Sequence, residues 1–177
     1  MARALKMMAT AGVIGAVGDV SIQLIEGSAP ADLDPRRTAR LSVYRSVQAP
    51  IVDMAWQRFD RWITLPGMLG VAAKVVADQS LLMPPSLVCF FTSQGLMEGL
   101  SWEASLDRVR RSWLPTLQVC APFWCTVHLC TFSLIPSHLR IAWASFAAVF
   151  WNAYISHANR QAQLSEQQEV ASAAFAQ

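Results

Sequence analysis

Long uncharged runs separate short charged segments along this chain. Residues 79–97 carry no Asp, Glu, Lys or Arg, and neither do residues 112–139 or 141–159. About 20 consecutive apolar residues cross the hydrocarbon core of a bilayer as a helix. The pattern therefore predicts membrane-spanning helices, with the second of these runs containing a span at about residues 118–135.

The first 25 residues are predicted to form one helix that carries a stripe of small residues and a stripe of polar residues. Gly12, Gly15 and Gly18 recur every three residues, and small residues on one stripe let a neighbouring helix approach closely. Asp19 and Gln23 lie four residues apart, so they share a face of the helix and form a polar stripe.

A second helix is predicted to begin at Asp34-Pro35. Asp is a preferred N-cap residue and Pro is favoured at the first helical position. The helix continues through Ile63, with a kink or break expected at Pro50. Arginines and tryptophans interleave along it, which suits either an anchor at the level of the lipid headgroups or a protein–protein surface.

The segment 74–84 combines charge, amide and proline before a long apolar run. Lys74 and Asp78 are four residues apart, so in a helix they can pair. Inside a bilayer such groups must face the bundle interior or a watery cavity. Together with Gln79 they suggest either a solute path or an ion pair that stabilises helix packing. Pro84-Pro85 is expected to interrupt the backbone hydrogen bonds.

Ser101 is predicted to cap a short amphipathic helix, residues 102–113, that lies flat on the membrane surface. The predicted fold is thus all-α: an integral membrane helix bundle of four to five spans plus this surface helix. Residues 1–160 form the bundle as a single domain, and residues 161–177 form a polar C-terminal tail outside the bilayer. Arginines lie in nearly every connection, which leaves the membrane orientation open.

Composition supports a membrane protein. The 177 residues are 54% hydrophobic and 15% charged, against about 25% charged in soluble domains. A soluble all-α domain is the less favoured alternative. The net charge of +2, without a basic stripe, argues against a nucleic-acid partner. The expected partners are the lipid bilayer and, within it, other membrane subunits or further copies of the chain.

No catalytic, cofactor-binding or metal-binding residues are predicted, and we expect no enzymatic activity. Cys120, Cys125 and Cys130 are spaced by five residues, unlike the closer spacing of zinc ligands. A thiolate–imidazole pair of Cys125 and His128 is conceivable. Small apolar packing residues and a hydrogen-bonded core histidine are the favoured interpretation.

An ordered set of landmarks over residues 12–160 resembles the Mpv-seventeen/peroxisomal-membrane-protein-twenty-two family of small integral membrane proteins. The landmarks include Gly18, Asp19, Gln23, Arg40, Pro50, Lys74, Asp78, Gln79, Pro84, Trp124, Pro136, Arg140, Trp151, Asn152, Tyr154 and Ser156. The resemblance implies a helical membrane bundle and a proposed role as a small-solute channel without catalysis. In that picture, the candidates for polar lining or buried pairs are Asp19, Gln23, Lys74, Asp78 and Gln79.

The resemblance leaves two functions open. One is a channel, expected in the mitochondrial inner membrane with the peroxisomal membrane as the alternative address. The other is a non-conducting accessory or structural subunit of a larger inner-membrane complex. Departures from the family pattern at Cys125, His128 and Thr131 cluster in one predicted span and favour the second. Arg3 and Lys6, ahead of an acid-free start, suit mitochondrial import.

Overall fold

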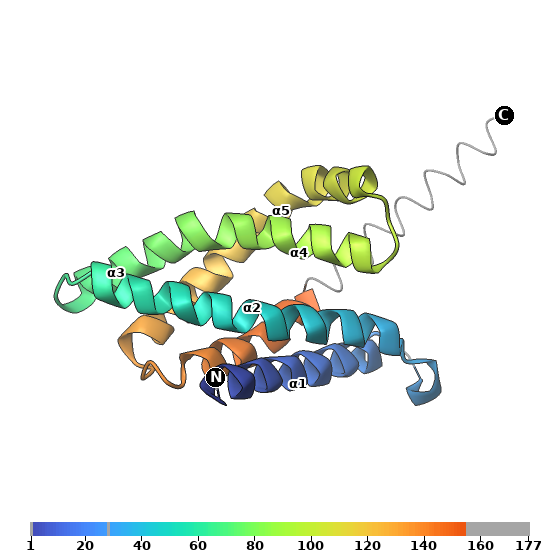
Figure 1. Cartoon of the computed structure of the whole chain (residues 1–177), viewed down its shortest axis with the longest axis horizontal. Coiled ribbons are helices and arrows are strands. Elements are labelled where there is room, and N and C mark those ends of the chain that lie inside the picture. Colours follow the sequence, from blue (N-terminus) through green and yellow to red (C-terminus); the bar gives the residue numbers. More distant parts are fainter. Residues whose placement is uncertain (1, 28, 155–177) are drawn as a thin grey trace.

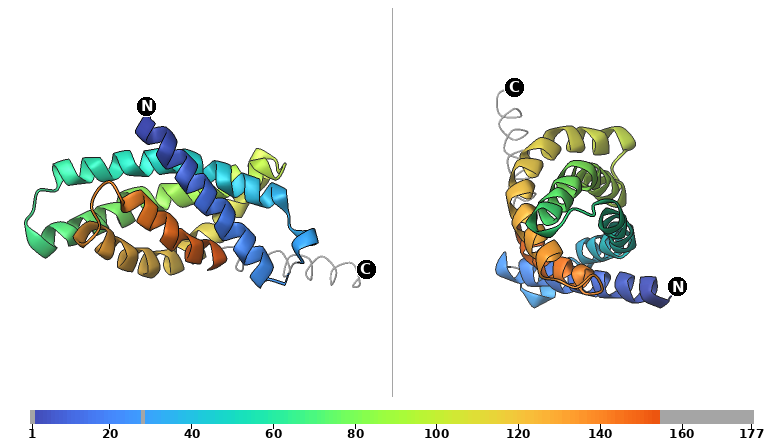
Figure 2. Two further views of the ribbon diagram at one scale, coloured as in Figure 1. Left: turned by 90° about the horizontal axis from the view of Figure 1, so that it is seen from below. Right: turned by 90° about the vertical axis from the view of Figure 1, so that its left-hand side faces the viewer.

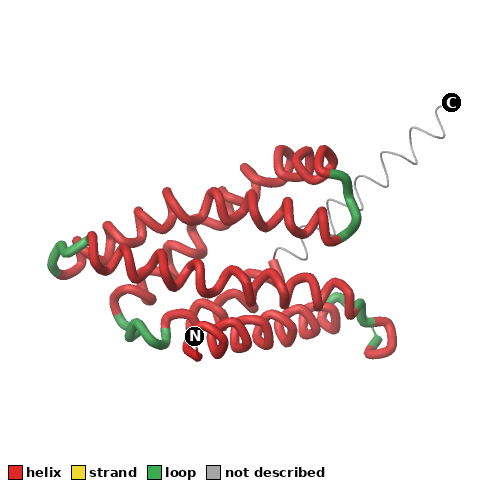
Figure 3. Tube along the Cα trace, in the orientation of Figure 1, coloured by secondary structure: helices red, strands yellow, loops and turns green. Residues whose placement is uncertain are grey.

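The computed structural model describes residues 2–27 and 29–154, and every regular element in that part of the chain is helical (Figures 1 and 3). A last helical segment, residues 140–154, follows the labelled helices. The labelled elements are α1 (Ala2–Ile25), the 3₁₀ turn η1 (Pro30–Asp32), α2 (Pro35–Trp62), α3 (Gly67–Ala77), the π-helical turn η2 (Asp78–Leu82), α4 (Met83–Met97) and α5 (Trp102–Ser133).

Helix α1 lies close against the first half of α2, as the glycine stripe predicted (Figure 1). The Ser42 hydroxyl donates a hydrogen bond to the Gly12 carbonyl at 2.9 Å, and the Ser46 hydroxyl donates to the Met8 carbonyl at 3.0 Å. A Cβ atom on Gly12 would collide with Ser46 Oγ. A side chain at this position would therefore displace the Ser46 hydroxyl from its hydrogen bond to the Met8 carbonyl.

Helix α2 begins where the sequence predicted. The Asp34 side chain accepts hydrogen bonds from the backbone N–H groups of Arg36 and Arg37, at 2.9 and 3.1 Å. The helix then runs through Pro50 to Trp62 without a break. A proline removes one backbone donor, and a long helix can continue past it when its remaining hydrogen bonds and packing are retained.

Residues 67–97 form one continuous helical rod containing a π-helical turn. Within η2, the Met83 N–H bonds to the Asp78 carbonyl, five residues earlier. This wider turn immediately precedes Pro84-Pro85. The predicted interruption of the α-helical hydrogen bonds is therefore a π turn. Turns of this kind are rare and occur often at functional sites.

The predicted surface helix and the following predicted span are one element, which corrects the boundary drawn from sequence. Helix α5 extends from Trp102 through Pro115 and Pro122 to Ser133, and its path bends strongly (Figure 2). Prolines bend helices at such positions. The predicted cap is confirmed, since the Ser101 hydroxyl accepts a hydrogen bond from the Ala104 N–H at 3.2 Å.

Two apolar clusters hold the bundle together. One contains Trp56, Phe59 and Phe132, from α2 and α5, and the other contains Phe91 and Trp124 with further residues of α4, α5 and segment 140–154. Aromatic rings pack edge to face there, as Trp56 does on Phe132 at a centroid distance of 5.8 Å. The polar groups of the candidate site lie between and beside these clusters.

Within the described residues, two helical stretches are long and apolar enough to cross a membrane: Ala4–Ile25 and Gly67–Met97. Four to five spans stay a prediction. The expected span at residues 118–135 falls mostly within α5, and the one at residues 141–159 is described only as far as residue 154. The predicted tail, residues 161–177, and Ser156 lie outside the described residues.

Candidate functional site

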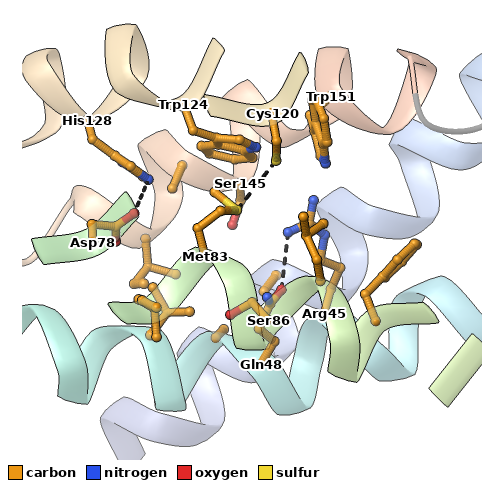
Figure 4. A pocket seen from close by; sticks show the side chains of 18 of the residues that line it. Arg45, Gln48, Asp78, Met83, Ser86, Cys120, Trp124, His128, Ser145 and Trp151 are labelled. Atoms are coloured by element: carbon orange, nitrogen blue, oxygen red, sulfur yellow. Dashed lines mark hydrogen bonds and ion pairs between the residues drawn. The ribbon is translucent and has the colours of Figure 1, made fainter. Parts of the chain in front are cut away.

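A cavity of about 120 Å³ lies inside the bundle, between α2, η2, α4, α5 and segment 140–154 (Figure 4). A single water needs roughly 10–15 Å³ measured in this way, so the cavity holds several waters or one small solute. Its walls combine apolar and polar side chains. The polar lining residues are Tyr44, Arg45, Gln48, Asp78, Ser86, His128, Ser145 and Asn152.

Asp78 occupies one end of the cavity and is 2% exposed. Its Oδ1 accepts a hydrogen bond from Trp56 Nε1 at 2.7 Å. Its Oδ2 accepts one from Gln79 Nε2 at 3.0 Å and lies 3.2 Å from His128 Nε2. The π turn places this carboxylate against α2 and α5 at once, so three neighbouring groups hold it in position.

Arg45 occupies the other end of the cavity (Figure 4). Its Nη2 donates to Asn152 Oδ1 at 2.9 Å, and its Nη1 donates to Gln48 Oε1 at 3.3 Å. Both acceptors are neutral amides. Arg45 is partly exposed and forms no ion pair with any carboxylate of the described residues, whereas Arg37 and Arg140 each do.

Sulfur and aromatic groups line the cavity between these ends. The Cys120 thiol, fully buried, donates to Met83 Sδ at 3.4 Å. The Trp124 ring stacks on the His128 ring at a centroid distance of 5.2 Å. His128 thus contacts Asp78 and Trp124 and has no contact with Cys125 that would make a thiolate–imidazole pair within the described structure.

Lys74 does not pair with Asp78, which corrects the prediction from their spacing. Lys74 Nζ instead lies 2.6 Å from Asp60 Oδ1 on α2. Arg140 Nη1 lies 2.5 Å from Asp60 Oδ2, so one carboxylate joins α2, α3 and the start of segment 140–154. Asp78 instead accepts hydrogen bonds from Trp56 and Gln79 and contacts His128.

Asp19 and Gln23 do interact, as their spacing predicted. Gln23 Nε2 donates to Asp19 Oδ2 at 2.8 Å, the Thr38 hydroxyl donates to the same oxygen at 2.6 Å, and Arg37 Nε donates to Asp19 Oδ1 at 2.9 Å. Arg37 also pairs with Glu26. This cluster joins the end of α1 to the start of α2 and does not line the cavity.

Comparison with known proteins identifies the family. The model of the Mpv17 / PMP22 family matches residues 95–156. Protein SYM1 of Eremothecium gossypii is 32% identical over 86% of this chain and 87% of the relative. Mitochondrial inner membrane protein Mpv17 of Danio rerio is 32% identical over 83% of this chain and 84% of the relative. Protein SYM1 of Saccharomyces cerevisiae is 28% identical over 84% and 79%. No solved structure matches significantly.

The chain belongs to the Mpv17 / PMP22 family. It is accordingly a membrane protein of the mitochondrial inner membrane, and the bilayer is its environment. The resemblance drawn from the ordered sequence landmarks is confirmed, and so is the inner-membrane address chosen over the peroxisomal one.

Several of the sequence landmarks that suggested the family resemblance meet at the cavity. Trp124, Trp151 and Asn152 line it, and Tyr154 packs on Trp151 at a centroid distance of 5.4 Å. Of the five predicted polar-lining residues, Asp78 alone lines the cavity. Lys74 binds Asp60, Asp19 and Gln23 join α1 to α2, and Gln79 contacts Asp78 from outside the lining.

The other sequence landmarks among the described residues lie outside the cavity lining. Gly18 faces Val149 in segment 140–154, the Pro84 carbonyl accepts a hydrogen bond from Trp113 Nε1, and Arg140 binds Asp60. The buried Nε of Arg40 makes no hydrogen bond within that part of the chain. Pro50 lies within α2, and Pro136 lies in the turn that follows α5.

Sequence reasoning missed Arg45, together with Gln48, as part of the site. A signal was present, because Arg45 is the only charged residue in the stretch 41–52. A solitary charge within an apolar stretch of a membrane protein marks a functional position by default. Arg45 is one of the arginines that interleave with tryptophans along α2, a pattern that instead indicated a headgroup anchor or a protein–protein surface.

Proposed function

We propose that the protein provides a path for small solutes through the mitochondrial inner membrane and catalyses no reaction. The observation that supports this is the central, partly open cavity, which Arg45 and Asp78 line within an apolar bundle. Ionisable groups inside a membrane are costly, and they recur along solute and ion pathways.

The structure changes which residues should control such a path. Asp78 lines the cavity, whereas Lys74 lies outside its lining and binds Asp60. Neutralising Asp78 therefore removes a negative charge from the path itself. Neutralising Lys74 removes an ion pair between helices and leaves the charge of the cavity unaltered.

The test is conductance of the purified protein in planar lipid bilayers. We expect conductance that changes its ion selectivity toward anions in Asp78→Asn and keeps its selectivity in Lys74→Gln. Bilayers exposed to the same detergent without protein provide the blank. A pure, folded protein that shows no conductance and no solute flux in liposomes would refute the proposal.

A non-conducting accessory subunit is the second candidate. One observation that favours it is the crowding of the cavity by Trp124, Trp151 and Met83, which line its walls. Purification in mild detergent separates the two candidates. Co-migration with a large assembly, combined with loss of that assembly on deletion of the protein, supports the accessory subunit, whereas a small free oligomer supports the solute path.

A further inference from the structure

The two charged groups of the cavity differ in how far their hydrogen-bonding capacity is used. Asp78 receives hydrogen bonds from Trp56 and Gln79 and contacts His128, at distances between 2.7 and 3.2 Å. Both carboxylate oxygens thus have protein partners. A cationic solute would have to displace these partners to reach Asp78.

Arg45 is the opposite case. A guanidinium carries five N–H donors and a permanent charge. Arg45 uses two of its nitrogens on the amide oxygens of Asn152 and Gln48, and no carboxylate of the described residues neutralises it. Arg37 and Arg140, by contrast, each contact a carboxylate. Arg45 therefore presents an unneutralised cation to the cavity.

We infer that Arg45, with Asn152 and Gln48 beside it, is the binding site for a small carboxylate anion in the cavity. The inference rests on the proposed function, because the bound carboxylate is the solute that the path would carry. A carboxylate matches the planar fork of a guanidinium and can accept two parallel hydrogen bonds from it. It also supplies the negative counter-charge that Arg45 does not receive from the described residues.

The surroundings of Arg45 specify the rest of the ligand. Leu87, Phe90 and Trp151 line the cavity beside the polar groups, so the body of the ligand should be apolar. The volume of about 120 Å³ admits a short aliphatic acid. The cavity offers one arginine, so a single negative charge fits best.

Propionate is the probe for testing this inference. Its binding to the purified protein in nanodiscs of zwitterionic lipid is measured by saturation-transfer NMR, with propionamide as the neutral molecule of the same shape. We expect saturable binding of propionate and at least about tenfold weaker binding of propionamide, since hydrogen bonds to charged groups are the stronger ones.

Three variants identify the site. Arg45→Gln should weaken propionate binding at least about tenfold. Asn152→Asp should also weaken propionate binding, because it places an internal carboxylate beside Arg45 that competes with the ligand. We expect this variant to fold, so it tests the site even if Arg45→Gln does not fold. Arg58→Gln is the matched control: Arg58 lies on the same helix outside the cavity lining, and this variant should bind like the unaltered protein.

Each outcome decides the inference. Equal binding of propionate and propionamide, or unreduced propionate binding in Asn152→Asp, would overturn it. Flux through liposomes without saturable propionate binding would leave the proposed function standing and overturn the carboxylate site. Saturable, Arg45-dependent binding without any flux would support the site and contradict the solute path.

Discussion

Two charged side chains, the buried Asp19 and the partly exposed Arg45, have contrasting surroundings in this bundle. Asp19 is 1% exposed and receives hydrogen bonds from Arg37, Thr38 and Gln23, including that of an opposite charge. Arg45 contacts only neutral amides and faces a cavity. A charge whose partners come entirely from the protein stabilises packing. A charge that lines a cavity and has no counter-ion among the described residues is available to a ligand.

The largest expected effect lies at Asp19. Asp19→Asn removes one of the two carboxylate partners of Arg37 at the contact between α1 and α2 and leaves Glu26 as the other. Breaking a buried pair by removing one partner costs about 3–5 kcal/mol. We expect stability to fall by about 3 kcal/mol, toward the low end because Arg37 is partly exposed. Equilibrium unfolding in mixed micelles measures the loss.

Arg45→Gln provides the other half of that comparison. Because Arg45 has no carboxylate partner, its removal leaves no opposite charge stranded, and we expect a stability change within about 1 kcal/mol. Equal losses for Asp19→Asn and Arg45→Gln in the same micelles would break the distinction between the paired and the unpaired charge.

Asp60 extends the comparison to a second paired site. Asp60→Asn weakens the contacts to Lys74 and Arg140 together, at a position where all three side chains are partly exposed. We expect a loss of about 2 kcal/mol. Lys74→Gln should cost less than Asp60→Asn, and the double variant should cost less than the sum of the two, because the residues share one network. An additive double variant would contradict the network.

Trp56→Phe tests whether the Asp78 end of the cavity behaves as a paired site. The substitution keeps an aromatic ring and removes the Nε1 donor that lies 2.7 Å from Asp78 Oδ1. Loss of one buried hydrogen bond to a charged group predicts about 1–2 kcal/mol lower stability. Unfolding in the same micelles checks this, and no loss at all would show that Trp56 does not hold Asp78.

The smallest effect on stability is expected for Asn152→Asp, which tests directly whether Arg45 lacks a carboxylate partner. Asn152→Asp supplies Arg45 with the carboxylate it lacks, and we expect a gain of up to about 1 kcal/mol. The thermal midpoint in detergent should rise or stay level. A clear fall would mean that the surroundings of Arg45 do not tolerate a carboxylate, which contradicts an anion site there.

Helix capping preferences and the spacing of residues along a helix predicted the contacts between residues that are close in sequence. The Asp34 and Ser101 caps, the close approach at Gly12 and the contact between Asp19 and Gln23 all follow from spacings of four residues or fewer, or from one glycine stripe. Pro50 was the exception, since it lies inside the continuous helix α2 where a kink or break was expected. Neighbouring helices can satisfy the backbone groups that a proline leaves without a partner.

The candidate site could be predicted only in part, because its contacts join distant segments. Asp78 pairs with His128 rather than with Lys74, and Arg45 meets Asn152 across 107 positions. Spacing along a helix identifies which residues share a face, but it does not choose among partners on other helices. The choice depends on tertiary packing, which here includes the π turn that directs Asp78 toward α2 and α5.

The reversal potential of the purified protein in a planar bilayer with a salt gradient tests the central claim most directly. If the unneutralised Arg45 governs a solute path, the unaltered protein prefers anions over cations, and Asn152→Asp loses that preference. An absence of conductance, or an anion preference that Asn152→Asp leaves unchanged, would contradict a path governed by Arg45.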